Sequence, residues 1–416
     1  MAKNYDLVLF GASGYTGQYV LEEFVRSFYY GKHTFAIAGR NRAKLEKTLQ
    51  TVGDYTGQDL KIPILVADSS DYDALLEVTK QATVVISVVG PFRLYGELLV
   101  KACVEGKASY VDISGEPSFI EKMDYTYREQ AEQNGVYIIS ACGFDSIPCD
   151  LGVQYLKDNF PGTLAYVETV AQGRPGPQGY KINDGTYQTI ILSIENMSQD
   201  NIREIRKQLM PEKLERLPFK APKRPLVWKD ERTGRYVLPF LGSDRSIVIR
   251  SQYNDAIANK KYPPYVETYF AAPSAVWAYL ILTWMAFVNL LTKFGPTRQF
   301  LKDYPDIASF GAFSKTGSNR AQVKSTTFTY YIHGTGWPES EPQVDKIPNR
   351  QLTVRVDGPD MGYIGTAGCV LSAALTIVED KDNLPSKGGA FTPATAFAKT
   401  NIHKRLESFN ITFKTV

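Results

Sequence analysis

The chain has 416 residues, of which 44% are hydrophobic and 22% are charged, and its formal net charge at pH 7 is +3. This composition is ordinary for a globular enzyme of two or three domains and excludes a disordered or low-complexity chain. A net charge this close to zero gives no indication of a nucleic-acid partner.

The cysteines, the histidines and the N-terminus bear on compartment and metal content. The four cysteines form no CxxC pair, and the three histidines are scattered without metal-ligand spacing. Residues 1–14 contain no apolar segment of signal-peptide length. We therefore expect a reduced, cytosol-facing protein without a metal site.

Residues 1–150 alternate between short apolar runs and helical patterns. Strands that alternate with helices are typical of a parallel sheet covered on both faces. We therefore predict a doubly wound α/β domain of the Rossmann type over residues 1–150. The predicted strands are 5–10, 34–39, 62–68, 83–90, 109–115 and 135–140, and the predicted helices are 16–28, 42–52, 72–81, 95–106 and 117–134.

The sequence GASGYTG follows the first strand and opens the first helix. In this context Gly11 permits a tight turn, Gly14 lets the backbone approach a pyrophosphate, and Gly17 lets the helix pack close to the strand. The spacing is GxxGxxG rather than GxGxxG, and a plain strand-to-helix turn is the alternative. We predict that the phosphates of a dinucleotide bind at Gly11, Ser13, Gly14, Tyr15, Thr16 and Gly17.

The second predicted strand ends in AGRNRAK, which contains Arg40 and Arg42 but no acidic residue. An acidic residue here would grip the ribose 2′-OH of NAD, whereas a guanidinium can bind a 2′-phosphate. NADP is therefore favoured over NAD, although a solvated basic start of a helix is the alternative. Asp68, at the end of the third strand, is predicted to contact adenine.

The ends of the later strands carry the candidate catalytic groups. Gly90 and Pro91 end the fourth strand, so Phe92 and Tyr95 are expected to wall the nicotinamide pocket. No tyrosine has a lysine four residues later, which argues against a short-chain dehydrogenase. Polar residues at two further strand ends would converge on the same rim, although each also suits a helix N-cap. They are Asp112, Ser114, Glu116, Asp145 and Ser146, of which Glu116 and Asp145 join Tyr95 as catalytic candidates, with Asp184 and Tyr187 as weaker ones.

Beyond residue 150 the pattern changes. After a predicted helix at 147–160, strand-like segments alternate with Pro- and Gly-rich turns, which favours a largely antiparallel α+β domain over 151–358. The tail, 359–416, is predicted to be helical with a final helix and strand at 401–413. The strand-like segments are 166–173, 235–242, 245–253 and 324–336.

No charged residue occurs between Thr268 and Thr292. As a helix, 274–292 would be about 28 Å long, which is marginal for a hydrocarbon core of about 30 Å. We expect an interfacial or hairpin contact with a membrane, with a buried or dimer-interface helix and a full span as alternatives. The basic stretch 203–235 and the pair Lys260–Lys261 could bind anionic headgroups or could be solvated loops.

Taken together, the chain resembles the saccharopine dehydrogenase-like oxidoreductases, relatives of mycobacterial trans-acting enoyl reductase. The matching segments are FGASGYTGQYV, AGRNRAKL, ATVVISVVGPFRLYGELLVKAC, YVDISGEP, GFDSIPCDLG and GGAFTPATAFAKT. The resemblance implies an NADP-type Rossmann domain completed by C-terminal helices, with an α+β insert between them. It also implies an association with lipid droplets or membranes and a role in lipid or glycolipid metabolism, with a mitochondrial location as an alternative.

Three functions follow from these expectations. The first is an NADP-dependent oxidoreductase that acts on a lipid-like carbonyl or double bond at a membrane or lipid-droplet surface. The second is a lipid-droplet protein that binds a dinucleotide without catalysis, and a homodimer is compatible with either. The third is saccharopine reduction, which ranks lowest because the sequence shows no local arginine cluster that would bind glutamate. In addition, true saccharopine reductases use a GxGxxG loop where this chain has GASGYTG.

Overall fold

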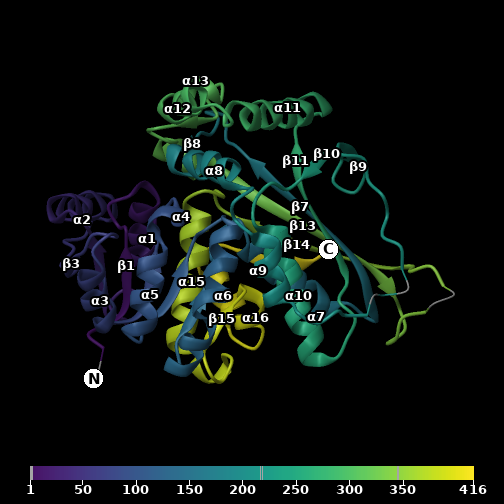
Figure 1. Ribbon diagram of the computed structural model, residues 1–416, viewed down its shortest axis with the longest axis horizontal. Helices are drawn as coiled ribbons and strands as arrows, with labels where there is room; N and C mark the ends of the chain where they lie inside the picture. The colour runs from purple at the N-terminus through teal and green to yellow at the C-terminus, as the bar shows by residue number, and fades with distance from the viewer. Residues whose placement is uncertain (1–2, 216, 218, 344–345) are drawn as a thin grey trace. The chain divides into compact units, whose positions relative to one another are not determined.

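The computed structural model describes residues 3–215, 217, 219–343 and 346–416 (Figure 1). The chain forms two compact units. Unit 1 runs to Asp145 and takes in Ile202–Leu209 and Met361–Ile411, whereas unit 2 comprises Ser146–Asn201, Met210–Asp360 and Thr412–Val416. A helix from the middle of the chain thus belongs with the N-terminal unit, and the last strand belongs with unit 2.

Unit 1 is built on a seven-stranded parallel sheet in the order β15-β6-β5-β4-β1-β2-β3. The chain moves outward from β1 to β3 and then returns to place β4 beside β1, which is the switch point where doubly wound sheets bind ligands. The predicted fold class is thereby confirmed. The strands are β1 (Tyr5–Phe10), β2 (Phe35–Gly39), β3 (Ile64–Val66), β4 (Ala82–Ser87), β5 (Ser109–Asp112), β6 (Tyr137–Ile139) and β15 (Gly389–Phe391).

The C-terminal segment supplies a central helix of unit 1. In α15 every residue from Gly365 to Ile377 is buried, and the helix packs against α1 and against strands β4 and β5. Its buried, largely apolar composition is typical of a helix inside a core. The unit 1 helices are α1 (Tyr15–Arg26), α2 (Arg42–Thr56), α3 (Tyr72–Gln81), α4 (Phe92–Tyr95), α5 (Glu97–Glu105), α6 (Pro117–Asn134), α9 (Ile202–Leu209), α15 (Ile364–Glu379), α16 (Pro393–Phe397) and α17 (Ile402–Ser408).

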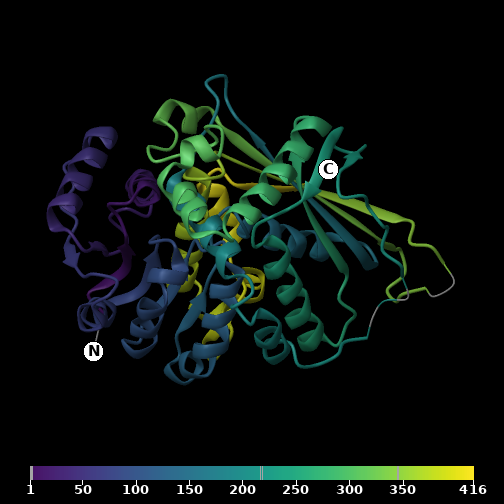
Figure 2. The ribbon, with the colours of Figure 1, turned by 45° about the horizontal axis from the view of Figure 1, so that its top comes forward.

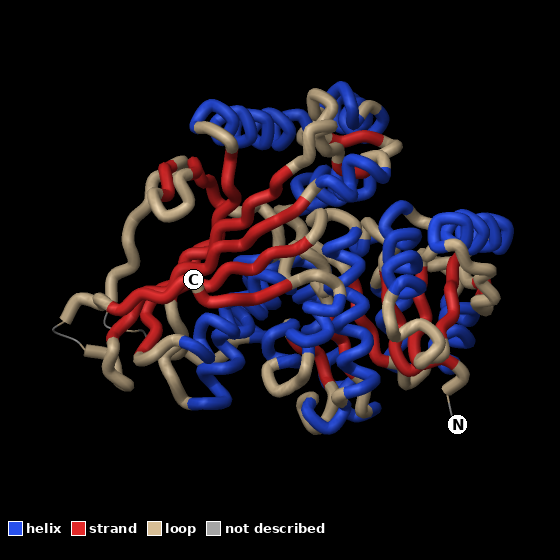
Figure 3. Tube along the Cα trace, turned by 180° about the vertical axis from the view of Figure 1, so that it is seen from behind, coloured by secondary structure: helices blue, strands red, loops and turns tan. Residues whose placement is uncertain are grey.

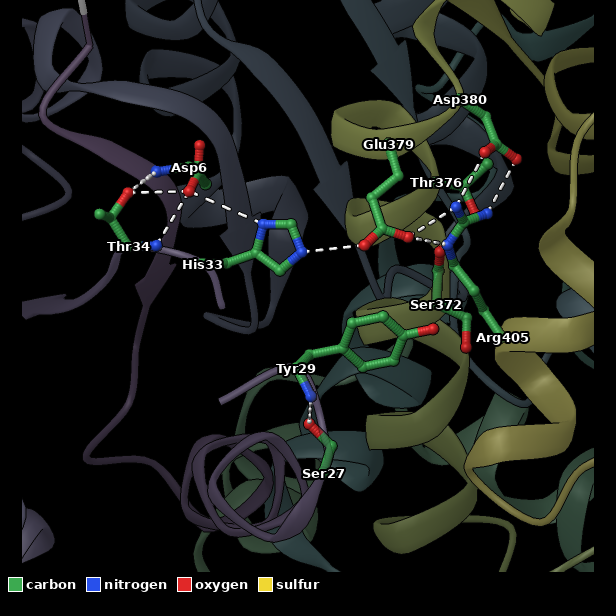
Figure 4. A network of polar contacts seen from close by, with 10 residues as sticks. All are labelled: Asp6, Ser27, Tyr29, His33, Thr34, Ser372, Thr376, Glu379, Asp380 and Arg405. Atoms are coloured by element: carbon green, nitrogen blue, oxygen red, sulfur yellow. Dashed lines mark hydrogen bonds and ion pairs between the residues drawn. The ribbon is translucent and has the colours of Figure 1, made fainter. Parts of the chain in front are cut away.

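A polar network joins the end of α15 to α17 and to the loop before β2 (Figure 4). Arg405 donates to Asp380 and Glu379, and the side chains of Arg405 and Asp380 are each only 7% exposed. His33 lies 3.0 Å from Glu379 and 3.7 Å from Asp6. Hydrogen bonds from Arg405 lower the pKa of Asp380 to about 2. The C-terminal helices are therefore held in unit 1 by buried charge pairing as well as by apolar packing.

We expect Arg405→Met to reduce the free energy of unfolding by about 3 kcal/mol, because Asp380 would stay buried without its cation. The pairing stabilises the fold above the ordinary pKa of 3.8 and is lost as the pH falls towards the folded value of about 2. The difference between parent and variant in urea unfolding should therefore shrink on acidification. Lys404→Met, on the exposed side of the same helix, should unfold like the parent.

Unit 2 contains a second seven-stranded sheet in the order β16-β14-β13-β7-β11-β10-β9 (Figure 3). Five of its six pairings are antiparallel, and only β7 with β11 is parallel. The sheet is thus largely antiparallel, in the sense expected for the insert. The strands are β7 (Thr163–Arg174), β9 (Trp228–Asp230), β10 (Arg235–Pro239), β11 (Tyr265–Ala272), β13 (Thr327–Trp337), β14 (Arg350–Gly358) and β16 (Thr412–Thr415).

The prediction of a strand over 245–253 is wrong, because this segment lies in helix α10 (Asp244–Asn259). The run Ile247–Ile249 has high strand propensity, but the buried positions Ile247, Val248, Ser251 and Gln252 repeat with the period of a helix. Burial of this face of α10 therefore favours a helix over a strand for this segment. The other unit 2 helices are α7 (Ile147–Asn159), α8 (Asp184–Asn196), α11 (Ala275–Leu291), α12 (Gly295–Asp303), α13 (Pro305–Ala308) and α14 (Arg320–Ser325).

Helices α8, α11, α12 and α13 form a small layer of unit 2 with the short strands β8 (Ile182–Asn183) and β12 (Phe313–Ser314) (Figures 1 and 2). The indole N–H of Trp284 on α11 donates to the carbonyl oxygen of Ala308 on α13 at 2.8 Å. The layer also has an apolar core of its own. The buried residues of this core are Tyr187, Ile191, Val288, Leu301 and Phe313.

Candidate functional site

Two glycines of the loop after β1 are required by the fold itself. Gly11 has φ of +95°, and a Cβ there would lie 2.5 Å from Cγ2 of Val89. A Cβ on Gly17 would lie 2.3 Å from the carbonyl oxygen of Gly11. The turn and the close approach of α1 to the loop therefore both need glycine, as the sequence pattern predicts.

Gly14 differs from the other two glycines. It is exposed, its φ is −73°, and a Cβ would meet only the carbonyl oxygen of Gly11, at 3.2 Å. Helix α1 begins at Tyr15 without a side-chain cap and without an acidic residue in its first turn. The positive end of the helix dipole thus faces an exposed loop with space for an anion, which fits a diphosphate.

The remaining residues of the predicted phosphate loop surround this helix start. Ser13 and Thr16 are half-buried. The ring of Tyr15 packs on Tyr363, with centroids 4.6 Å apart, and on Tyr19. The Tyr15 ring therefore joins α1 to the segment before α15. Any contribution of Tyr15 to a cofactor site would come from its backbone N–H.

Arg40 and Arg42 are exposed at the end of β2 and the start of α2. Within the described part of the chain, neither side chain has a hydrogen bond or an ion pair. Asp68, after β3, accepts hydrogen bonds from Ser70, and these bonds, together with the nearby charge of Arg40, lower its pKa. The structure thus brings Arg40 and Asp68 together at the carboxyl edge and leaves both guanidinium groups available to a phosphate.

Glu116 is 1% exposed and lies at the same edge of the sheet. Its two carboxylate oxygens accept hydrogen bonds from the backbone N–H groups of Phe92, at 2.7 Å, and Arg93, at 3.1 Å. Burial raises the pKa of Glu116, and these two hydrogen bonds oppose that shift. The carboxylate therefore holds the start of α4 in place after Gly90–Pro91.

Asp112, at the end of β5, makes the corresponding link to the next loop. Its Oδ1 accepts hydrogen bonds from the N–H groups of Ser114 and Ala141, each at 2.9 Å. The hydroxyl of Ser114 in turn accepts a hydrogen bond from the N–H of Glu116 at 3.2 Å. Sequence reasoning placed these polar residues on one rim but missed that they form a single chain of hydrogen bonds across three strand ends.

We expect Glu116→Ala to lower the free energy of unfolding by about 2 kcal/mol, because the buried N–H of Phe92 and the partly buried N–H of Arg93 would lose a charged acceptor. Hydrogen exchange at Phe92 and Arg93 should become faster. Glu97→Ala removes an exposed carboxylate that pairs with Lys122 on the surface, and it should change neither measurement. Unchanged exchange in the Glu116 variant would contradict the positioning role.

The other candidates at this edge differ in accessibility. The ring of Phe92 is 5% exposed and packs against Phe119, so it faces the interior, whereas Tyr95 is 43% exposed. The half-buried carboxylate of Asp145 lies against the turn before Glu116, since a Cβ on Gly115 would be 2.6 Å from its Oδ2. Ser146 belongs to unit 2.

The candidates in the insert have structural partners. Tyr187 is fully buried in the core of the α8–α13 layer, where burial and the charge of Asp184 raise its pKa to about 12. Three arginines of the basic stretch 203–235 pair with buried carboxylates, although their own side chains remain 33–41% exposed. Arg206 binds Glu121 within unit 1, and Arg224 and Arg232 bind Glu168 within unit 2.

Comparison with known proteins agrees with this geometry. Residues 7–139 match the family model of the saccharopine dehydrogenase NADP binding domain, which confirms the predicted NADP cofactor. The match runs from within β1 to the end of β6 and therefore includes the glycine loop, Arg40 and Glu116.

Curated relatives match nearly the whole length of the chain. A Caenorhabditis elegans lipid droplet localized protein is 47% identical over 99% of this chain and 98% of its own length. A human saccharopine dehydrogenase-like oxidoreductase is 37% identical over 99% of this chain and 97% of its own. A plant relative from Arabidopsis thaliana, 29% identical over 99% of this chain and 96% of its own, carries a mitochondrial designation.

Two more distant proteins complete the comparison. A Mycobacterium tuberculosis protein of the trans-acting enoyl reductase type is 33% identical over 48% of this chain and 46% of its own. The structure of saccharopine dehydrogenase (L-Glu forming) from Saccharomyces cerevisiae superposes with a TM-score of 0.56 and 15% identity over 99% of this chain and 100% of that one, which shows a shared fold. The chain belongs to the saccharopine dehydrogenase-like oxidoreductases and carries their NADP-binding domain.

Proposed function

We propose that this protein uses NADPH to reduce a lipid-like carbonyl or enoyl substrate at a membrane or lipid-droplet surface. In this proposal residues 1–150 and 359–416 hold the cofactor, and 151–358 provide the substrate and lipid contacts. The observation that carries it is an NADP-binding domain in the same chain as a charge-free helix with an exposed apolar face.

The cofactor half supports the redox part of the proposal. NADPH, when bound, supplies a hydride to the substrate carbon. The loop Gly11–Gly17 would hold its diphosphate, and Arg40 with Arg42 its 2′-phosphate. Glu116 is assigned to positioning α4, because both of its oxygens are engaged by backbone N–H groups. Asp145 and Tyr95 then remain as the proposed proton donors.

Helix α11 supports the lipid part. Only Ala278 and Val288 of its 17 residues are buried. No helix among the described residues is both long and apolar enough to cross a membrane. An apolar face of this kind suits a helix that lies in the plane of the membrane–water interface rather than across the membrane. A relative named for its lipid-droplet location matches 99% of this chain. The exposed apolar side chains are Val276, Trp277, Tyr279, Leu280, Phe287 and Leu290.

We expect Leu280→Asp combined with Phe287→Asp to abolish flotation of the protein with phospholipid vesicles. Both side chains are more than half exposed and lie seven residues apart on one face of α11, so the fold should tolerate the change. Thermal unfolding should stay at the parent temperature. Flotation equal to that of the parent would contradict the lipid contact through 274–292.

The redox part is tested by single-turnover oxidation of NADPH with a cellular lipid extract. NADPH should raise the unfolding temperature of the protein more than NADH does, and the extract should then oxidise the bound cofactor. Extraction of the products and mass spectrometry would show a gain of two hydrogen atoms in the substrate. A larger shift with NADH would contradict the NADPH preference.

A second candidate is a lipid-droplet protein that binds the dinucleotide without catalysis. The engagement of Glu116 by two backbone N–H groups favours it, because one candidate acid is thereby assigned to structure. In that case NADPH would bind but remain unoxidised in the same experiment. Saccharopine reduction, the least favoured alternative, would instead require NADPH oxidation with aminoadipate semialdehyde and glutamate.

Location and assembly complete the proposal. We assign the protein to the cytosolic face of lipid droplets or membranes, with mitochondria as the alternative that the plant relative suggests. Microscopy of a C-terminally tagged chain separates the two. Sedimentation of the purified protein would show whether it forms a homodimer.

A further inference from the structure

We propose that the tip of unit 2 at Ile307–Phe310 is a second lipid-inserting anchor, which acts together with α11. The inference rests on the lipid contact in the proposed function and extends it to a segment outside 274–292. The partner of this tip is the phospholipid layer that covers a membrane or lipid droplet. The acyl chains would surround the Phe310 ring, and anionic headgroups would surround the base of the tip.

The tip exposes two large apolar side chains on a backbone that is held in place. Phe310 is 91% exposed and Ile307 is 64% exposed. The buried hydroxyl of Ser309 donates to the carbonyl oxygen of Pro305 at 2.6 Å and accepts from the N–H of Phe313 at 2.9 Å. The Phe310 ring is therefore presented to the outside by an ordered turn.

The backbone at this position does not favour phenylalanine. Phe310 has φ of +53°, a left-handed conformation in which asparagine or glycine is preferred. Neither the local backbone nor core packing accounts for an aromatic ring that is almost fully exposed. A role outside the folded unit explains its presence.

The tip belongs to the same layer as α11. The Trp284 indole joins α11 to Ala308, one residue from Ile307, and Leu301 of α12 packs with Val288 of α11 in the shared core. Figures 1 and 3 show α11 beside α12 and α13. Between the two anchors, Phe294, Phe300 and Tyr304 are also exposed. Exposed apolar side chains thus occur along the chain from α11 to the tip.

The composition of the surface favours a lipid layer over a protein partner. From Thr268 to Ser318 the chain has four basic and two acidic residues. Arg298 and Lys302 pair with Glu195, which leaves Lys293 and Lys315 exposed to contact anionic headgroups. The two acidic residues, Asp303 and Asp306, are exposed as well, so the exposed charges of the segment balance. Trp277 and Tyr279 add the amphipathic rings typical of an interface. A projecting ring needs no complementary groove when the partner is fluid.

Two anchors would fix the orientation of unit 2 on the lipid surface, which one helix does not. A single interfacial helix can roll about its own axis, whereas a second point of insertion off that axis fixes the orientation of the layer. The tip therefore determines which face of unit 2 meets the lipid, in addition to strengthening binding.

The test replaces Phe310 with Asn, a residue suited to φ of +53°. Thermal stability should stay the same or rise, while partitioning onto phosphatidylcholine vesicles with about a quarter phosphatidylserine should weaken about tenfold. Ile347→Asn is the matched control, because Ile347 is 87% exposed in unit 2 outside this layer. Its partitioning should equal that of the parent.

A second variant reports insertion directly. Phe310→Trp should add fluorescence that brominated phospholipids quench, relative to the parent protein. Unchanged partitioning of Phe310→Asn, or no added quenching in Phe310→Trp, would overturn the anchor while vesicle binding by the parent still supports the α11 contact. Failure of the parent to bind vesicles would overturn both the lipid contact and the anchor.

Discussion

Replacement of Gly14 by Val is expected to abolish binding of both NADPH and NADH and to leave the apoprotein folded. Gly14 is exposed with φ of −73°, and a Cβ there meets only the Gly11 carbonyl oxygen, at 3.2 Å. The isopropyl group would instead occupy the space over the uncapped start of α1, where a diphosphate would approach the backbone. Isothermal titration with each cofactor measures the loss, and thermal unfolding of the apoprotein checks the fold.

Gly17→Ala provides the contrasting case. A Cβ on Gly17 would lie 2.3 Å from the Gly11 carbonyl oxygen and 2.8 Å from Cα of Ala12, so α1 would have to move away from the loop. This variant should therefore be less stable even without cofactor. If Gly14→Val still binds NADPH with parental affinity, the phosphates do not lie over this helix start. If it loses stability as Gly17→Ala does, its effect on binding is structural.

The parallel sheet was predictable because its signal is local. Strands covered on both faces appear as short apolar runs, as in β1 and β4, and each is followed by an amphipathic helix. The glycine spacing marked the first turn because Gly11 and Gly17 are required by backbone geometry, which depends on neighbours close in sequence. Few topological choices then remain for the order of the strands, which the structure supplies.

The roles of the rim residues were not predictable, because they depend on contacts distant in sequence. Glu116 looked like a catalyst, and its hydrogen bonds to the N–H groups of Phe92 and Arg93 become visible only once β4 and β5 lie side by side. Phe92 is expected to wall the cofactor pocket, and its packing against Phe119 on α6 could not be inferred from the sequence. Residue type alone does not separate such alternatives.

The conformation of the insert was also harder to predict, because it depends on contacts between residues distant in sequence. The β-branched run Ile247–Ile249 favoured a strand, and only the buried side of α10 shows why it forms a helix. The basic stretch 203–235 suits either a surface for anions or a solvated loop, and the buried partners of its arginines, Glu121 and Glu168, lie elsewhere in the sequence. Helix α11 was conspicuous from its lack of charge, but which residues face outward required the positions of Val288 and Trp284.

Replacing Arg40 and Arg42 together by Ala is expected to weaken NADPH binding by about 1–3 kcal/mol for each lost charge-assisted contact and to leave NADH binding nearly unchanged. Both side chains are exposed, and neither has an ion pair or a hydrogen bond within the described residues. Their removal should therefore leave the stability of the apoprotein at the parental value. The affinity ratio between the two cofactors, measured by titration, isolates recognition of the 2′-phosphate.

Lys47→Ala is the matched control, because Lys47 is an exposed cation further along α2. It should change neither affinity if the effect requires contact rather than general positive charge. The NADPH preference of the parent should also decline as salt is added, because the guanidinium groups are solvent-exposed and their attraction is screened. Equal losses for NADPH and NADH in the double variant would mean that Arg40 and Arg42 do not read the 2′-phosphate, and selectivity would then have to come from another cation at the carboxyl edge.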